Sequence, residues 1–285
     1  MKLTDKQPSA THRVLIFGDA KTGKTQLAAT LSARYKLIWF DLERGYGTLL
    51  KLPKNQQENI ELISIPDSKT FPIAIETMLK VITGKECKIC EEHGKVACPI
   101  CNKDNKPTST VELSSLAQDT VVVIDSLTQL TNSAIAFITK NQPEDYKMQF
   151  DDWGNLRAIV EKFLSQIQQA RYNVVCISHV EEVEMENGSK RLVPVCGSSK
   201  SSRNVAKYFD HVIYCEIKNK KHIAASTTTY LNNVISGSRT DYILEQAVEP
   251  SLIVLFSSHS TKNSQDPGTV ALNQRKNLSG INIKK

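Results

Sequence analysis

The sequence has no apolar run long enough to cross a bilayer, and its first eight residues lack the apolar stretch of a secretory signal. We therefore expect neither a membrane partner nor secretion, and we expect the chain to stay in the cytoplasm. Internal repeats are also absent, which excludes a solenoid of repeated units. What remains is 285 residues, 40% hydrophobic and 23% charged, enough for one large globular domain or two small ones.

Positive charge exceeds negative charge, since the net charge is +6 at pH 7. This permits contact with nucleic acid without establishing it. Residues 257–285 are predicted to form a flexible basic tail, either solvated or contacting phosphates, and residues 1–11 to form an amino-terminal arm. The tail contains one acidic residue, Asp266, and five basic residues, Lys262, Arg275, Lys276, Lys284 and Lys285.

Apolar runs rich in β-branched residues alternate with longer helical patterns across residues 12–256. This alternation is typical of an α/β fold with a mainly parallel central sheet flanked by helices. Several runs are apolar at every position, as expected for strands covered on both faces. Residues 83–110 are polar and bear cysteines, so they are predicted to be an insertion. The expected strands cover residues 13–17, 37–40, 60–65, 120–124, 173–177 and 211–216, and the expected helices cover residues 71–82, 126–139 and 153–171.

One segment fits the pattern G-x-x-x-x-G-K-[ST] and follows the apolar run 14–17. Its glycines let the backbone curl so that N–H groups point at phosphates, and the following helix adds the positive end of its dipole. Lys24 is predicted to reach the β- and γ-phosphates of ATP, and Thr25 to hold Mg²⁺. This predicted phosphate loop consists of Gly18, Asp19, Ala20, Lys21, Thr22, Gly23, Lys24 and Thr25.

A carboxylate at the end of a neighbouring strand completes the predicted magnesium site. Asp125 follows the apolar run 121–124 about a hundred residues after the phosphate loop. It is predicted to hold Mg²⁺ together with Thr25. The alternative is an aspartate that caps the helix after a buried strand.

Two more polar residues follow expected strands, at the edge where ligands of open α/β sheets bind. Glu43 follows the run 37–40 and is predicted to orient and deprotonate the attacking water. The alternative is a solvated Glu43 with Asp41 as a cap. His179 ends a third strand and is predicted to hydrogen-bond the γ-phosphate and so report whether ATP or ADP is bound. A histidine that merely caps its strand is the alternative.

Four cysteines of the insertion form two C-x-x-C pairs, Cys87 with Cys90 and Cys98 with Cys101. Four thiolates complete the tetrahedral shell that Zn²⁺ prefers, although the linker between the pairs is shorter than usual. A cytoplasmic chain argues against disulfides, which remain an alternative together with free thiols, and His93 is a possible substitute ligand. The insertion is too small to fold alone, so zinc is predicted to replace a core, in a knob that is structural or contacts DNA or another subunit.

Together these segments resemble the RecA-like recombinase ATPases, and more closely their compact phage-borne relatives that act in recombination and single-strand annealing. The matches run in order through most of residues 12–255 and include the phosphate loop, Phe40–Glu43, Val122–Thr128 and Cys176–His179. The resemblance implies a RecA-like P-loop core that hydrolyses ATP to ADP and phosphate and is stimulated by single-stranded DNA. It also implies the host cytoplasm if a phage encodes the chain.

The resemblance also implies partners. Residues 180–200 would take the place of the family's mobile DNA-binding loop, and residues 203–210 would form the helix that leads into the next strand. Arg239 falls where the family places basic residues that touch a neighbouring subunit's nucleotide, which implies a homo-oligomer with Arg239 acting in trans. A surface arginine is the alternative. A single-strand DNA-binding protein is a further implied partner.

Two departures from the family limit this comparison. The first twelve residues are too short for the polymerisation element of full recombinases, so annealing or a ring fits better than strand exchange along filaments. The region 180–200 is also acidic, and its glutamates would repel a phosphate backbone unless they point away. These glutamates are Glu181, Glu182, Glu184 and Glu186.

Other P-loop proteins remain as alternatives. A small-molecule kinase would usually carry an arginine-rich lid between late helices, and the sequence shows none. A GTPase would carry N-K-x-D after the magnesium strand, whereas Asn102–Asn105 lacks the final aspartate and precedes that strand. A nucleotide-gated binding module with negligible turnover is the third alternative, and it would leave Glu43 without a role.

Overall fold

The computed structural model describes residues 11–226, 233–239, 244 and 247–257. Apart from Thr11 and Ser257, the predicted arm and the predicted basic tail lie outside these residues. The strands are β1 (Arg13–Gly18), β2 (Lys36–Asp41), β3 (Ile60–Ser64), β4 (Cys87–Cys90), β5 (Thr108–Val111), β6 (Thr120–Asp125), β7 (Asn173–Glu184), β8 (Lys190–Pro194), β9 (His211–Lys218), β10 (Lys221–Ala225), β11 (Gly237–Ser238) and β12 (Ala247–Val248). The helices are α1 (Lys24–Ala29), α2 (Lys54–Gln57), α3 (Ile73–Val81), α4 (Pro99–Lys103), α5 (Leu127–Thr139), α6 (Phe150–Gln169), α7 (Ser199–Asn204) and α8 (Ile253–Ser257), with short 3₁₀ turns η2 (Thr30–Ala33), η3 (Tyr46–Lys51), η4 (Leu113–Ser115) and η5 (Val205–Tyr208).

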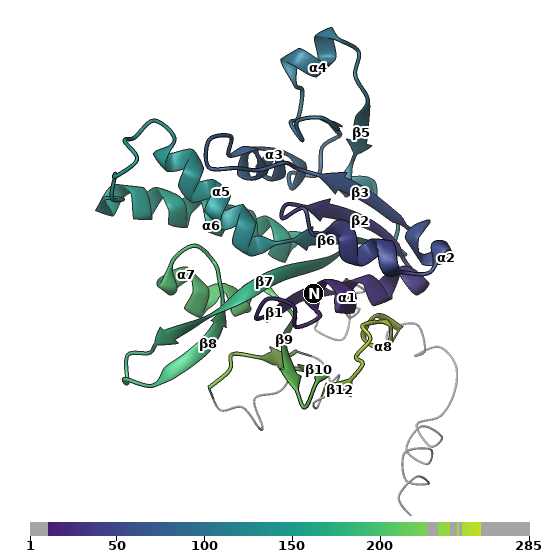
Figure 1. The fold of residues 1–285 in the computed structure, drawn as a ribbon, viewed down its shortest axis with the longest axis vertical. Coiled ribbons are helices and arrows are strands. Elements are labelled where there is room, and N and C mark those ends of the chain that lie inside the picture. The colour runs from purple at the N-terminus through teal and green to yellow at the C-terminus, as the bar shows by residue number, and fades with distance from the viewer. Residues whose placement is uncertain (1–10, 227–232, 240–243, 245–246, 258–285) are drawn as a thin grey trace, which may run out of the picture.

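The centre of the molecule is a large sheet with the strand order β12-β10-β9-β1-β7-β6-β2-β3. The neighbours from β9 to β3 are all parallel, and β10 and β12 extend the β9 edge in antiparallel fashion. All six strands expected from the sequence lie in this parallel part. The predicted mainly parallel α/β fold is therefore confirmed (Figure 1).

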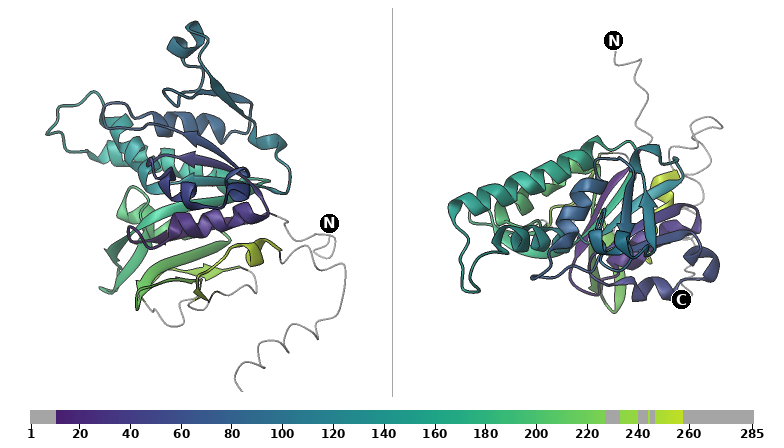
Figure 2. Two further views of the ribbon diagram at one scale, coloured as in Figure 1. Left: turned by 45° about the vertical axis from the view of Figure 1, so that its right-hand side comes forward. Right: turned by 90° about the horizontal axis from the view of Figure 1, so that it is seen from above.

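Helices cover both faces of the sheet because alternate strand residues point to opposite faces. Val14 and Ile16 of β1 belong to a core with residues of α1 and α8, whereas Leu15 and Phe17 belong to a core with residues of α3, α5 and α6. Figure 2 shows the teal α5 and α6 on one side of the sheet and the purple α1 on the other. The central strands β1 and β6 are thus buried on both sides, which explains their apolar runs.

The insertion after α3 forms its own small unit. β4 and β5 pair as an antiparallel ribbon that carries α4 and extends away from the sheet in Figure 1. Thr77 of α3 donates a buried hydrogen bond to the carbonyl of Gly94 at 2.8 Å, which fastens the insertion to the core.

The segment after His179 differs from the expected loop. β7 continues without a break to Glu184 and pairs with β8, so that most of residues 180–200 form an antiparallel hairpin. The helix expected at residues 203–210 is also displaced, since α7 starts at Ser199 and η5 ends at Tyr208.

Within the described residues, no helix combines the length and the hydropathy required to span a membrane.

Candidate functional site

The polar residues predicted from four strands meet at one edge of the sheet. Gly18 at the end of β1 pairs with His179 of β7, and Asp125 of β6 pairs with Asp41 of β2. All these strands run in the same direction, so their carboxyl ends lie together. The register thus gathers the predicted phosphate loop and its predicted polar partners into one site.

The predicted phosphate loop connects β1 to α1 and wraps around the side chain of Lys24. This lysine is buried, and its Nζ donates to the carbonyl oxygens of Gly18 at 2.9 Å and Asp19 at 2.6 Å. Burial lowers the pKa of Lys24, because a buried ammonium loses its water shell. A phosphate group would give this positively charged ammonium a negatively charged partner.

Thr25 and Asp125 lie together directly beside the lysine. The hydroxyl of Thr25 donates to Oδ2 of Asp125 at 3.1 Å. Burial, and then the charge of Glu43, raise the pKa of Asp125 to about 7. A hydroxyl and a carboxylate are the hard oxygen ligands that Mg²⁺ prefers, so this pair fits the predicted magnesium site.

Glu43 contacts two neighbours rather than projecting freely into solvent. Ser126 donates its hydroxyl hydrogen to Oε1 of Glu43, and Nε2 of His179 lies 3.6 Å from Oε2. Burial acts to raise the pKa of Glu43, but His179 and Ser126 outweigh it and hold the pKa below its ordinary value. The carboxylate is therefore ionised at neutral pH, held in place, and still 31% exposed for contact with water.

Asp41 caps the turn after β2, as the alternative interpretation of this segment expected. Its Oδ1 accepts hydrogen bonds from the backbone N–H groups of Glu43 at 3.3 Å and Gly45 at 2.9 Å. Asp41 thereby fixes the backbone that carries Glu43. Capping by Asp41 and a site role for Glu43 are compatible.

Two residues of the site were not assigned from the sequence. Ser126 orients Glu43 and also caps α5 by accepting from the N–H of Gln129. Thr128 accepts from the N–H of His179 at 2.8 Å and so fixes the end of that strand. Both residues belong to the Asp-Ser-Leu-Thr turn after β6. This turn was the feature of the sequence that could have identified them.

Arg239 does not join this cluster within its own chain. β11 pairs with the amino end of β9, whereas the phosphate loop lies toward the carboxyl end of that strand. Nη2 of Arg239 donates to the carbonyl of Lys207 at 2.8 Å, and Nη1 lies 3.5 Å from Oδ1 of Asp210. The role of Arg239 in trans stays a prediction.

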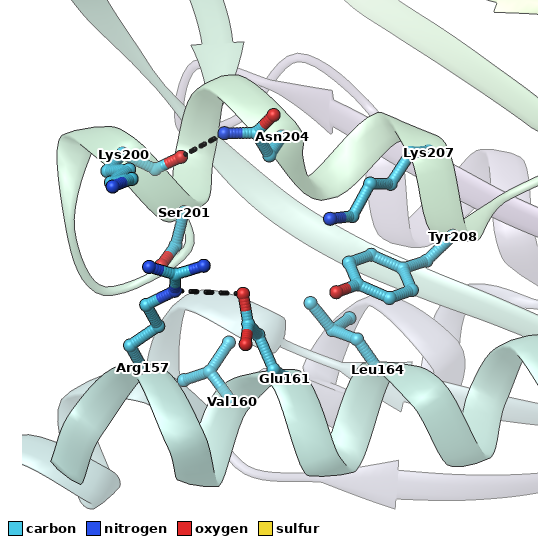
Figure 3. Close-up of a pocket in the computed structure, with 9 residues that line it drawn as sticks. All are labelled: Arg157, Val160, Glu161, Leu164, Lys200, Ser201, Asn204, Lys207 and Tyr208. Atoms are coloured by element: carbon cyan, nitrogen blue, oxygen red, sulfur yellow. Dashed lines mark hydrogen bonds and ion pairs between the residues drawn. The ribbon is translucent and has the colours of Figure 1, made fainter. Parts of the chain in front are cut away.

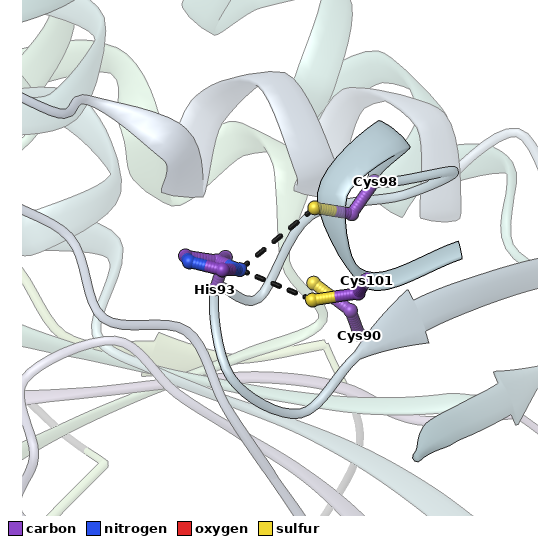
Figure 4. Close-up of side chains that lie close together, drawn as sticks. All are labelled: Cys90, His93, Cys98 and Cys101. Carbon is purple, nitrogen blue, oxygen red and sulfur yellow. Dashed lines mark hydrogen bonds between the residues drawn. The ribbon is translucent and has the colours of Figure 1, made fainter. Parts of the chain in front are cut away.

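A second cluster of ligand-type side chains lies in the insertion. The ligand atoms of Cys90, His93, Cys98 and Cys101 all lie within 4.8 Å of one another (Figure 4). Nδ1 of His93 is 3.2 Å from Sγ of Cys101 and 3.8 Å from Sγ of Cys98. In a tetrahedral zinc site with these ligands, neighbouring ligand atoms lie about 3.6 Å apart. The cluster therefore fits Zn²⁺.

The structure places His93 rather than Cys87 beside Cys90, Cys98 and Cys101, so the cluster differs from the predicted four-cysteine set. Cys87 and Cys90 are three residues apart on β4, so their side chains point to opposite faces of the ribbon. Cys87 and Ile89 face the main core, while Cys90 faces Cys98 and Cys101. Burial raises the pKa of the Cys87 thiol, as expected for a packing residue.

Replacement of single cysteines of β4 tests the ligand set. Cys90→Ala is expected to lower bound zinc from about one equivalent to less than about half, whereas Cys87→Ala keeps it. His93→Ala behaves like Cys90→Ala, because each removes one of four ligands. Metal analysis of the folded, gel-filtered proteins measures this. Loss of zinc in Cys87→Ala but not in His93→Ala would restore the four-cysteine site.

Comparison with known proteins identifies the family of the chain. Residues 10–240 match a family model described as an AAA domain. Among solved structures, the chain is similar to a prototypical ATPase from the type III secretion system of pathogenic bacteria. That likeness has 14% identity and a TM-score of 0.42, and it covers 73% of this chain and 52% of that chain. The chain thus spans about half the length of that ATPase. A comparison with curated proteins finds no match.

The family match includes the phosphate loop and all the residues around it, and it extends over most of the chain. The protein is therefore a P-loop ATPase and belongs to the AAA domain family.

Proposed function

We propose that the protein hydrolyses ATP to ADP and phosphate at the strand-edge site and couples the nucleotide state to binding of single-stranded DNA. One observation carries this proposal. His179 lies 3.6 Å from Glu43, and the strand that holds it continues directly into the β7–β8 hairpin. A shift of His179 on loss of the γ-phosphate would therefore move the base of the hairpin.

The proposed hydrolysis divides the work among the residues described above. Lys24 and the loop N–H groups bind the phosphates, and Thr25 with Asp125 would hold Mg²⁺, which would neutralise charge on the phosphate oxygens. Glu43 accepts a proton from the attacking water. His179 contacts the γ-phosphate from the neighbouring strand.

The proposed DNA surface lies between the hairpin tip and α7. A groove of about 820 Å³ there is lined by Arg191, Lys200 and Arg203, with Glu186 as its acid. Nε of Arg203 is buried, and no hydrogen-bond partner for it occurs among the described residues. The basic side chains that line the groove would contact the phosphates of a bound strand.

The neighbouring hollow extends the same basic surface. Lys200, Lys207 and Arg157 line it together with Glu161 (Figure 3). Arg157 is already paired with Glu161 at 2.9 Å. Lys200 and Lys207 therefore supply the positive charge of the hollow that Glu161 does not neutralise. On the hairpin, Glu182 is paired with Lys190 at 2.8 Å, so this acid repels phosphates less than its sequence suggested.

We further propose that the protein acts in phage DNA recombination or annealing as a homo-oligomer. Arg239 supports the oligomer, because 58% of its side chain is exposed at the sheet edge opposite to its own phosphate loop. A neighbouring subunit's nucleotide is the phosphate such an arginine could reach. The resemblance to phage-borne annealing ATPases supports the pathway, and a single-strand DNA-binding protein is the proposed further partner.

Single-stranded DNA is expected to raise the ATPase rate of the full chain. The double variant with Lys200→Ala and Arg203→Ala is expected to bind DNA more weakly. The negative slope of log affinity against log salt is expected to become shallower by about 0.7 for each cation removed. Fluorescence anisotropy with a labelled oligonucleotide measures the slope, and phosphate release measures the rate. Lys54→Ala, an exposed lysine on α2, serves as the control. Indifference to DNA combined with stimulation by a small molecule would instead favour a P-loop kinase.

A further inference from the structure

The turn from Cys90 to Gly94 in the insertion packs directly against the segment that follows β3. Cys90 and His93 bring two of the four ligands to this turn, and the N–H of Gly94 closes it by donating to the carbonyl of Cys90 at 2.8 Å. Gly94 adopts a φ of +62°, and a Cβ built on it would lie 2.8 Å from Cα of Ile65 and 2.9 Å from Cδ of Pro66. The backbone next to His93 thus lies against the backbone of Ile65, with no room for a side chain between them.

The same turn is tied to the core from α3. The buried hydroxyl of Thr77 donates to the carbonyl of Gly94 at 2.8 Å. Inside the insertion, the three ligand cysteines form a buried cluster beside His93 (Figure 4). Because these side chains are themselves the ligands, a zinc ion takes the place of an apolar core, and the turn loses its fixed shape without the ion.

The segment after β3 supports the turn that carries Glu43. The N–H of Ile65 donates to the carbonyl of Asp41 at 3.0 Å. Asp41 in turn caps the backbone of Glu43 and Gly45 through its Oδ1. A displacement of Ile65 would therefore be passed to the backbone of Glu43.

Asp67 connects the same segment to the other support of Glu43. Its Oδ2 accepts from the side-chain amide of Gln129 at 2.9 Å. The backbone N–H of Gln129 donates to the hydroxyl of Ser126 at 3.2 Å, and Ser126 donates to the carboxylate of Glu43. Oδ1 of Asp67 also accepts from the hydroxyl of Ser133 at 2.8 Å, which holds the segment against α5 at a second point.

We propose that the zinc site of the insertion positions Glu43 for its reaction with water, with Thr77 and Gly94 as positioning residues. The four ligands fix the turn, the turn holds residues 65–67, and these residues hold both supports of Glu43. Lys24 and the rest of the phosphate loop lie between β1 and α1, outside this series of contacts. Loss of zinc therefore slows hydrolysis and leaves ATP binding intact. The proposal rests on the proposed ATP hydrolysis at the strand-edge site.

Replacement of a zinc ligand separates hydrolysis from ATP binding. Cys90→Ala is expected to lose zinc, to lower kcat about tenfold and to leave the Kd for ATP unchanged. Cys87→Ala is the matched control, because it removes a buried thiol from the same strand and is expected to keep both zinc and kcat. Metal analysis, phosphate release and calorimetric titration of the full chain with ATP provide these values, and unfolding midpoints confirm that the variants fold.

Thr77→Val tests the contact without touching a ligand. This variant is expected to keep zinc and to lower kcat about fivefold, whereas Thr77→Ser keeps the hydroxyl and retains the rate. In the Glu43→Gln protein, Thr77→Val is expected to cause no further loss, because the group that it positions is already replaced. Single-turnover phosphate release measures this slow background.

Three results would overturn the proposal. Normal kcat in zinc-free Cys90→Ala means that zinc supports the insertion alone. ATP binding that weakens as much as kcat falls means that the effect reaches the phosphate loop. A further fivefold loss from Thr77→Val in the Glu43→Gln protein means that the contact acts elsewhere. An unmodified protein that binds ATP without hydrolysing it refutes the proposed hydrolysis itself, whereas normal hydrolysis in the zinc-free protein removes only the positioning role.

Discussion

A Glu43→Gln protein is expected to bind ATP as tightly as the unmodified protein and to hydrolyse it at least about 100-fold more slowly. Glutamine has the same shape and keeps an oxygen that accepts from Ser126, so the loop geometry is preserved. It cannot accept a proton from water. Because the carboxylate of Glu43 is ionised at neutral pH, the variant loses a base that is present under ordinary assay conditions.

Single-turnover phosphate release and equilibrium ATP binding, measured on the same preparation, separate the two effects. Glu61→Gln is the matched control, because Glu61 is an exposed glutamate of β3 without a place in the site. Hydrolysis at the normal rate in Glu43→Gln would remove Glu43 as the base. If the unmodified protein itself shows negligible turnover, the nucleotide-gated binding module becomes the better description.

The central sheet was predictable because burial on both faces leaves an unmistakable sequence. β6 is apolar from Val121 to Ile124, and all of these residues are fully buried. The order of the strands could not be obtained from the same pattern, since every buried parallel strand has a similar composition. The phosphate loop nevertheless located the edge at which Glu43, Asp125 and His179 meet, because parallel strands share one carboxyl end.

Longer-range pairing explains what the sequence analysis missed. Val180 to Glu184 is rich in glutamate, and only its pairing with β8 makes it a strand. A signal was present, because Asn187–Gly188 between two alternating segments is a hairpin turn, and Gly188 has a φ of +76°. Strand parity was a second unused signal, since Cys87 and Cys90 cannot point to the same side of one strand.

Lys24→Ala is expected to weaken ATP binding by at least about 100-fold and to abolish hydrolysis. The ammonium is buried within the loop and donates to the carbonyls of Gly18 and Asp19, so its charge is available to phosphate oxygens. Alanine would remove the charge-assisted hydrogen bonds that Lys24 is proposed to make to the β- and γ-phosphates. Lys36→Ala, an exposed lysine at the start of β2, removes the same charge away from the loop and is the control.

The fold of Lys24→Ala is expected to survive, because burial already disfavours the charged form of this lysine, as its lowered pKa shows. An unfolding midpoint close to that of the unmodified protein, together with lost ATP binding, would therefore assign the loss to phosphate recognition. ATP binding that persists in Lys24→Ala would contradict the phosphate-loop assignment.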